Sequence, residues 1–188
     1  MGRVDKAWLE MDRVTNLMVI NGVMLFDDPI DYASLQRAFE QRMVNQFPRF
    51  RQHIVEAPAG SNRLFWEDDP YFDIRSHVLH IALPEPGDTA TLQRLVSDLM
   101  SSGLDRTKPL WRIYLIDNVN GGCAIYSRFH HCIADGIALM RVMLSMTERE
   151  PAASLLPVIE LPESAAPATA GGLVSSSFRF AMRTTKRA

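Results

Sequence analysis

The sequence predicts an α/β fold in which a mixed β-sheet is flanked by helices. One observation is that runs with strand-like alternation, such as residues 111–117 and 123–130, interleave with segments of helical spacing, such as residues 89–100. The other is size and composition: 188 residues, of which 47% are hydrophobic and 22% charged, can bury one sizeable core.

The first half of the chain is expected to alternate between helices and strands. The expected elements are a helix over residues 4–13, a strand over 17–26, a helix from Asp31 to Pro48, and strands over 49–55, 63–67 and 72–83. Asp31 can cap its helix, since an aspartate side chain accepts hydrogen bonds from the N–H groups of the first turn. The turn-rich segment 58–62 separates two of the strands.

The second half predicts a helix, a β-hairpin and a further helix. Asp88 or Thr89 caps a helix that Gly103 stops, and residues 118–122 form the turn between the hairpin strands 111–117 and 123–130. The helix from Gly136 to about Thr147 is apolar almost all round, so we expect it to be buried. Its methionines either pack the core or line a flexible acyl-chain tunnel.

Two adjacent histidines end the second hairpin strand. Because side chains alternate along a strand, His131 shares a face with Cys123, Ile125, Ser127 and Phe129, and His130 shares the other face with Ala124, Tyr126 and Arg128. The two rings therefore cannot do the same job. Imidazole exchanges a proton near neutral pH, so one ring is a candidate general base. The alternative is a pair of hydrogen-bonded structural histidines.

The motif around these histidines supports a family resemblance. His130, His131, Asp135 and Gly136 spell HHxxxDG, which resembles the active-site motif of the CoA-dependent acyltransferase superfamily. Three further stretches resemble its bacterial wax ester synthase/diacylglycerol acyltransferase branch, namely Pro109-Leu110-Trp111 with the strand after it, residues 5–10, and residues 23–26. The resemblance spans roughly residues 4–150 and implies a fold of the chloramphenicol acetyltransferase type.

The resemblance also implies a role for each motif residue. His131 would be the general base, His130 would support it, and Asp135 would form a structural ion pair with an arginine, for which Arg51 and Arg112 are candidates. An aspartate just before a helix is also an ordinary N-cap, so that reading of Asp135 stays open. Gly136 would suit a tight turn with close backbone approach, which would let the pantetheine arm pass.

The implied reaction is transfer of a fatty acyl group from acyl-CoA to a long-chain alcohol or diacylglycerol, giving a wax ester or triacylglycerol. Acyl-CoA would be a co-substrate, with no further cofactor and no metal. Two other interpretations remain: a condensation-type domain acting on carrier-protein thioesters, and a non-catalytic half-domain that scaffolds a partner. The Pro109-Leu110-Trp111 stretch and the Trp8-Leu9 stretch favour the O-acyltransferase, and the intact motif argues against the non-catalytic reading.

Members of this branch contain two such domains, so residues 1–150 would form the first, and a C-terminal half of the same enzyme would be its partner. Residues 151–172 are rich in proline and alanine and predict a linker. Residues 173–188 carry basic and aromatic residues without an acidic one. They are either a frayed tail or an amphipathic helix that contacts an anionic membrane, a lipid inclusion or a partner.

Charge and cysteine content argue against several other classes. The net charge of −2 and the lack of a known nucleic-acid motif argue against nucleic-acid binding. Cys123 and Cys132 have neither zinc-site spacing nor disulfide density, which predicts reduced thiols in a cytoplasmic protein. No segment has the apolar core of a signal peptide or the roughly 18 apolar residues of a membrane span. His77 and His80 are expected to be structural.

Overall fold

The computed structural model describes residues 1–57, 63–134 and 136–146. The helices are α1 (Arg3–Met11), α2 (Tyr32–Phe39), α3 (Thr89–Met100) and α4 (Gly136–Ser145), and the strands are β1 (Val19–Phe26), β2 (Gln52–Glu56), β3 (Leu64–Asp68), β4 (Val78–Ala82), β5 (Trp111–Val119) and β6 (Gly122–His130). The expected linker 151–172 and tail 173–188 lie outside the described residues, so both stay predictions.

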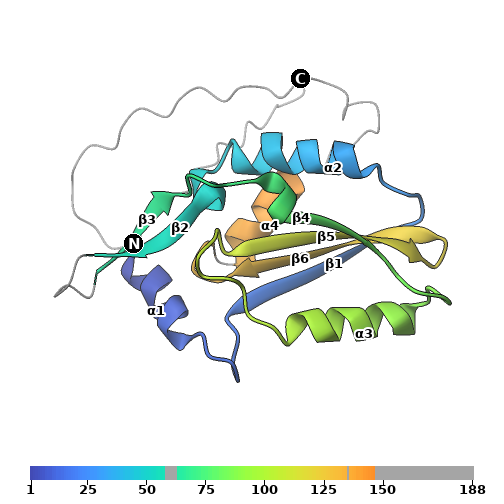
Figure 1. Ribbon diagram of the computed structural model, residues 1–188, viewed down its shortest axis with the longest axis horizontal. Coiled ribbons are helices and arrows are strands. Elements are labelled where there is room, and N and C mark those ends of the chain that lie inside the picture. The colour runs from blue at the N-terminus through green and yellow to red at the C-terminus, as the bar shows by residue number, and fades with distance from the viewer. Residues whose placement is uncertain (58–62, 135, 147–188) are drawn as a thin grey trace, which may run out of the picture.

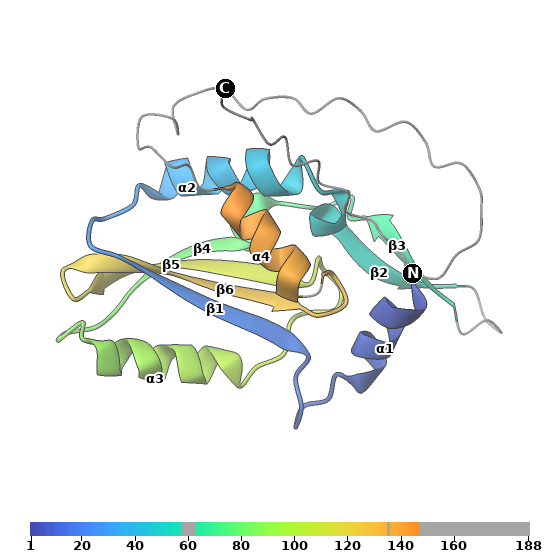
Figure 2. The same cartoon turned by 180° about the vertical axis from the view of Figure 1, so that it is seen from behind.

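A four-stranded sheet forms the centre of the fold, and the strand order is β1-β6-β5-β4. β4 runs parallel to β5, whereas the β5–β6 and β1–β6 pairs are antiparallel, so the sheet is mixed. Strands β2 and β3 form a separate antiparallel pair. In Figures 1 and 2, α3 covers one face of the sheet, and α2 and α4 lie on the other. The predicted α/β class with a mixed sheet is confirmed.

The alternation of β6 separates two cores, as its sequence predicts. Cys123, Ile125 and Phe129 belong to the larger hydrophobic cluster, which also contains Leu139 of α4. The intervening Ala124 and Tyr126 belong to the smaller cluster, which includes Leu92 of α3. All nine residues of β6 are buried. The motif that follows is therefore attached to the most deeply buried strand of the sheet.

Both predicted aspartate caps are present. The Asp31 side chain accepts a hydrogen bond from the Ser34 N–H at 2.8 Å, and the Asp88 side chain accepts one from the Thr91 N–H at 2.8 Å. Asp88 is therefore the N-cap of α3. The caps satisfy N–H groups that a helix start leaves without a partner.

Two expected strands are shorter than predicted, because each begins with a 3-10 turn. Pro48 opens a 3-10 helix over Pro48–Arg51, which delays β2 until Gln52. In the segment 72–83, the Asp73 side chain accepts from the Arg75 N–H and caps a 3-10 helix over Ile74–Ser76, so β4 begins only at Val78. A proline and a capping aspartate therefore override the β-like composition.

The expectation that α4 is buried all round is wrong for this chain. Leu139 and Val142 face the core with 5% and 2% exposure, whereas Ile137, Met140 and Leu144 are 62–68% exposed. A helix on one side of a sheet can bury only the stripe that faces it, so among the described residues part of the opposite apolar stripe stays exposed. We call Ile137 and Met140 the open face of α4.

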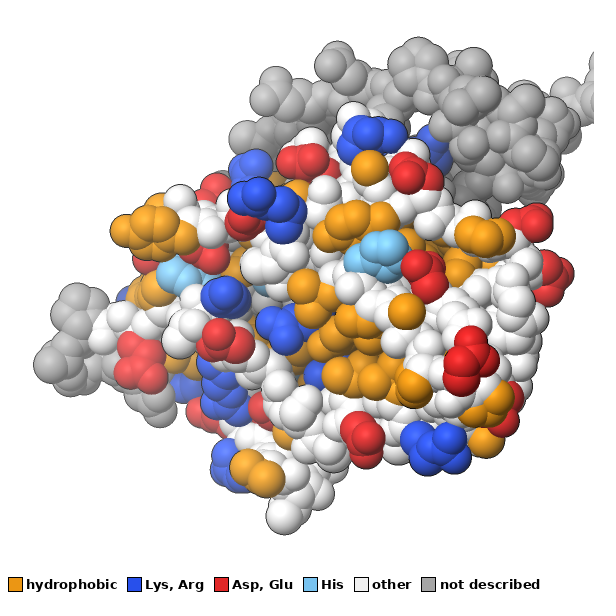
Figure 3. All heavy atoms as spheres, turned by 45° about the vertical axis from the view of Figure 1, so that its right-hand side comes forward, with side chains coloured by type: hydrophobic (Ala, Val, Ile, Leu, Met, Phe, Trp, Pro, Cys, Tyr) orange, Lys and Arg blue, Asp and Glu red, His pale blue; other side chains and the backbone are white. Residues whose placement is uncertain are grey.

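The surface is otherwise mixed in charge. On the face shown in Figure 3, hydrophobic side chains gather near the centre, and acidic and basic side chains alternate around them. Within the described ranges, no helix has the length and apolarity needed to cross a bilayer.

Candidate active site

The histidine pair lies where β6 ends. His130 is the last residue of the strand and is 1% exposed, and His131 begins the turn that leads to α4. The His131 N–H donates to the Met18 carbonyl at 2.8 Å, which ties the turn to the residue just before β1. The site is thus built from the carboxyl end of β6, the start of β1 and the α1 helix.

Both ring nitrogens of His130 face protein groups. Its Nδ1 accepts a hydrogen bond from the Cys132 N–H at 3.1 Å, so in the neutral ring the proton is on Nε2. Nε2 lies 3.6 Å from Oδ2 of Asp12. Burial lowers the pKa of His130, and the negative charge of Asp12 only partly offsets this effect. A neutral ring with both nitrogens turned to the protein is suited to support its neighbour.

The ring of His131 has different surroundings. It stacks on the indole of Trp8 in α1, with ring centroids 4.3 Å apart and an angle of 21° between the planes. Its Nδ1 is buried and has no hydrogen-bond partner among the described residues. The two rings therefore occupy separate environments, as the alternation of side chains predicts. The role of His131 as the general base stays a prediction.

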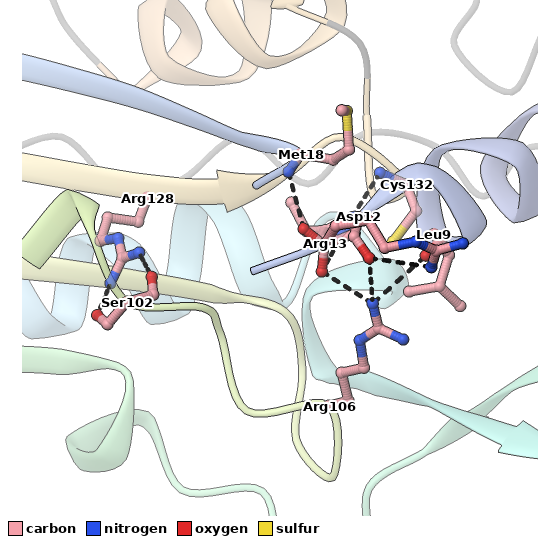
Figure 4. Close-up of polar contacts among 9 residues, drawn as sticks. Leu9, Asp12, Arg13, Met18, Ser102, Arg106, Arg128 and Cys132 are labelled. Carbon is pink, nitrogen blue, oxygen red and sulfur yellow. Dashed lines mark hydrogen bonds and ion pairs between the residues drawn. The ribbon is translucent and has the colours of Figure 1, made fainter. Parts of the chain in front are cut away.

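A carboxylate outside the motif completes the site. In Figure 4 the Asp12 side chain lies between Arg106 and the backbone of Met18. Arg106 Nη2 donates to its Oδ2 at 2.9 Å, and the Met18 N–H donates to its Oδ1 at 2.8 Å. Burial alone raises the pKa of Asp12, but these hydrogen bonds outweigh burial, so its pKa is lowered. Asp12 is therefore ionised at neutral pH.

Sequence reasoning missed Asp12 and Arg106 as site residues. Trp8 was found only as part of a stretch that resembles the family. The predicted first helix over residues 4–13 includes Asp12, and nothing in that position indicates a contact with a histidine 118 positions further along the chain.

The remaining motif residues are only partly described. Asp135 lies outside the described residues, so its ion pair stays a prediction. Of its two candidate partners, Arg51 pairs with Asp68 at 3.3 Å, and Arg112 has a buried Nε without a partner in the described part of the chain. Gly136 opens α4, and a Cβ added there would meet no heavy atom within 4 Å. The expected tight turn with close backbone approach at Gly136 therefore stays a prediction, as does passage of the pantetheine arm.

The neighbouring cysteine is not a nucleophile. Cys132 is 1% exposed, and burial raises the pKa of its thiol to about 12. Because the thiolate is the reactive form, this thiol is inert at neutral pH. No group of three or more His, Cys, Asp or Glu residues that could hold a metal ion occurs in the ranges that the structure describes.

The two other predicted structural histidines both have partners. His77 Nδ1 lies 2.9 Å from the Trp111 carbonyl oxygen, and its ring is stacked against Phe72 and Trp111. His80 Nε2 lies 2.6 Å from Oδ2 of Asp117. Neither ring contacts the motif histidines.

Acid should destabilise the fold through its buried histidines. Burial lowers the pKa of both His77 and His130 from 6.5. Below about pH 6.5 the unfolded chain takes up protons that the folded chain does not, so stability should fall as the pH drops toward the lower folded-state values. Thermal unfolding between pH 8 and 5 measures this, and His77→Gln should flatten the dependence. A melting temperature that is constant over this range would contradict the prediction.

Comparison with known proteins identifies the family. Residues 1–185 match the family model of the wax ester synthase/diacylglycerol acyltransferase catalytic domain. The probable diacylglycerol O-acyltransferases tgs3 and tgs1 of Mycobacterium tuberculosis are 32% and 34% identical to this chain over 155 and 141 residues. These alignments cover 79% and 74% of this chain but only 57% and 30% of the relatives. The chain therefore spans between about a third and just over half of the length of these relatives.

Solved structures agree with this assignment. The wax ester synthase/diacylglycerol acyltransferase from Marinobacter aquaeolei VT8 has a TM-score of 0.62 at 27% identity, covering 75% of this chain and 36% of that one. The starter condensation domain of rhizomide synthetase has the same TM-score at 16% identity, covering 78% and 35%, and shows the shared fold alone. The expected chloramphenicol acetyltransferase type of fold agrees with these neighbours. Since the family model covers nearly the whole chain, the chain belongs to the wax ester synthase/diacylglycerol acyltransferase family.

Proposed function

We propose that this chain is the N-terminal half of an O-acyltransferase that moves a fatty acyl group from acyl-CoA to a long-chain alcohol or a diacylglycerol. The observation that carries the proposal is the intact HHxxxDG sequence in a member of this family, with His131 held at the end of β6 against Trp8. The products would be a wax ester or a triacylglycerol.

The mechanism needs one base and no covalent enzyme intermediate. His131 takes the proton from the acceptor hydroxyl as its oxygen attacks the thioester carbonyl and forms a new C–O bond. The tetrahedral intermediate then collapses, the C–S bond breaks, and the proton passes from His131 to the leaving CoA thiolate. General catalysis of this kind contributes roughly 10² to 10⁴ in rate. His130 supports the base, and Asp135 holds the loop through an ion pair with an arginine.

Acyl-CoA would enter as a co-substrate rather than as a resident cofactor. A mutant of the rhizomide synthetase condensation domain has been solved in complex with C8-CoA, which supports acyl-CoA binding by this fold. A C-terminal half of the enzyme would close the substrate site. The coverage of the relatives supports this partner, as does the open face of α4. The enzyme would be cytoplasmic, and residues 173–188 would either form a frayed tail or contact a membrane or lipid inclusion.

Three substrates test this function against its alternatives. The complete enzyme, which contains this chain and the C-terminal half, is assayed with palmitoyl-CoA and, separately, hexadecanol, diolein and hexadecylamine. Release of free CoA with hexadecanol or diolein is the expected result. Turnover with the amine alone would favour the condensation-type reading, and no turnover with any acceptor would favour the non-catalytic one.

A further inference from the structure

The contacts that hold both motif histidines converge on one carboxylate outside the motif. We propose that Asp12 is a positioning residue for the histidine pair and that Arg106 holds its carboxylate in place. This inference rests on the proposed acyltransferase function, and it assigns a role to two residues that HHxxxDG does not contain.

The Asp12 carboxylate is fixed from two sides. Its Oδ1 accepts from the Met18 N–H, and its Oδ2 accepts from Arg106 Nη2. The same nitrogen of Arg106 lies 3.4 Å from the carbonyl oxygens of Leu9 and Asp12, so the guanidinium also holds the carboxyl end of α1. The Asp12 side chain is only 12% exposed, whereas that of Arg106 is 51% exposed. A surface arginine thus holds a nearly buried carboxylate.

Asp12 acts on His130 through the edge of the ring. Since the Cys132 N–H donates to Nδ1, the Nε2–H of the neutral ring faces Asp12 Oδ2 at 3.6 Å. This distance exceeds the usual 2.7–3.2 Å of a hydrogen bond, so the interaction is mainly between the charge and the N–H dipole. Arg106 and His131 are the other charged or titratable groups that influence the pKa of His130. The negative charge favours the ring orientation that keeps Nδ1 on the Cys132 N–H.

Asp12 acts on His131 through the backbone. The N–H of Met18 is bound by the Asp12 carboxylate, and the C=O of Met18 accepts the N–H of His131 at 2.8 Å. One residue therefore connects the carboxylate to the main chain of the candidate base. This connection fixes the position of the turn at the end of β6.

The stacking partner of His131 depends on the same group. Trp8 belongs to α1, and Arg106 and Asp12 hold the carboxyl end of that helix. If the carboxylate were lost, the indole and the imidazole could shift together. Because a displacement of about 1 Å can reduce a rate roughly 10²-fold, this support should matter more for turnover than for substrate binding.

Asp12→Asn in the complete enzyme tests the proposal with an isosteric loss of charge. We expect kcat to fall at least tenfold while KM for palmitoyl-CoA stays within twofold, and Asp12→Glu should recover part of the lost rate. Asp73→Asn is the matched control. Asp73 also accepts from an arginine and from a backbone N–H, but it contacts neither motif histidine. This control should keep kcat within twofold of the original enzyme.

NMR titration of His130 in the same ¹⁵N-histidine-labelled enzyme gives a second readout that does not depend on activity. Asp12→Asn removes the attraction to a protonated ring, so the pKa of His130 should fall further. Arg106→Gln removes a repulsive cation, so the pKa of His130 should rise, although kcat should fall in both variants. If Asp12 and Arg106 acted only on the stability of the fold, their loss would not shift the pKa of His130 in opposite directions while lowering kcat in both variants.

Two results would overturn the proposal. One is a folded Asp12→Asn enzyme with kcat within twofold of the original, and the other is a His130 titration that neither variant moves. If the Asp12→Asn variant does not fold, the proposal is judged from kcat and the His130 titration of the Arg106→Gln variant. An original enzyme without acyltransferase activity would instead refute the proposed function, and the titration would still decide whether Asp12 and Arg106 position His130.

Discussion

Replacing His131 with alanine should abolish acyl transfer while leaving the fold intact. As the candidate base, His131 would remove the hydroxyl proton, and loss of such a base costs roughly 10² to 10⁴ in rate. The ring packs on Trp8, and its Nδ1 has no hydrogen-bond partner in the described part of the chain, so its removal should disturb few polar contacts. The measurement is kcat of the complete enzyme with palmitoyl-CoA and hexadecanol, with the unfolding temperature as the check of the fold.

His130→Ala should reduce kcat less but lower stability more. It leaves the Cys132 N–H without its acceptor and the Asp12 carboxylate without the facing ring. An unsatisfied buried donor costs about 1 to 3 kcal/mol. His130→Asn retains an acceptor and should recover part of that stability. His80→Ala, on β4, where the ring pairs with Asp117, serves as the control for removal of an imidazole.

Equal losses of rate in folded His131→Ala and His130→Ala enzymes would contradict the assignment of one base. A His131→Ala enzyme that retains most of its activity would show that His131 is not the base.

The local features of the fold could be predicted because their causes are local. The alternation of β6 determines which side chains enter each core, and Asp31 and Asp88 cap helices within three residues of themselves. The two shortened strands were mispredicted because single residues, Pro48 and Asp73, favour 3-10 turns over an otherwise β-like composition.

The site could be predicted only in part, because its support is not local. The motif identified His130 and His131, but the groups that hold them come from α1 and from the loop before β5, about a hundred residues apart in sequence. Asp12 and Arg106 are ordinary surface-type residues in the sequence, and only the folded chain shows that one is nearly buried beside a histidine.

Helix α4 is apolar on almost every side, yet one of its apolar sides is exposed. The sequence predicts a helix that is buried on every side, and the structure buries only the side that faces the sheet. Both observations agree if the open face of α4 contacts a part of the enzyme beyond the described residues. The Leu25 side chain on the edge strand β1 is also 62% exposed, which adds to the uncovered apolar surface.

The 188-residue chain by itself should therefore associate with itself and fail to turn over substrate. General acid–base catalysis needs an enclosed active site that holds the thioester near the alcohol and excludes water. One half of such a site would do neither. Mixing the chain with a separately produced C-terminal half should restore a defined complex and activity. Sedimentation velocity and CoA release measure the two effects.

A pair of matched variants locates the contact. Met140→Gln places a polar side chain of similar length on the open face of α4, and Met100→Gln makes the same change at the 44% exposed end of α3, on the other side of the sheet. Burying a methionine contributes about 1.5 to 3 kcal/mol, so Met140→Gln should weaken assembly with the C-terminal half by about tenfold or more. Met100→Gln should leave assembly unchanged. A purified chain that is monomeric and esterifies hexadecanol at the rate of the complete enzyme would show instead that this chain forms a whole active site, and the open face of α4 would then need another explanation.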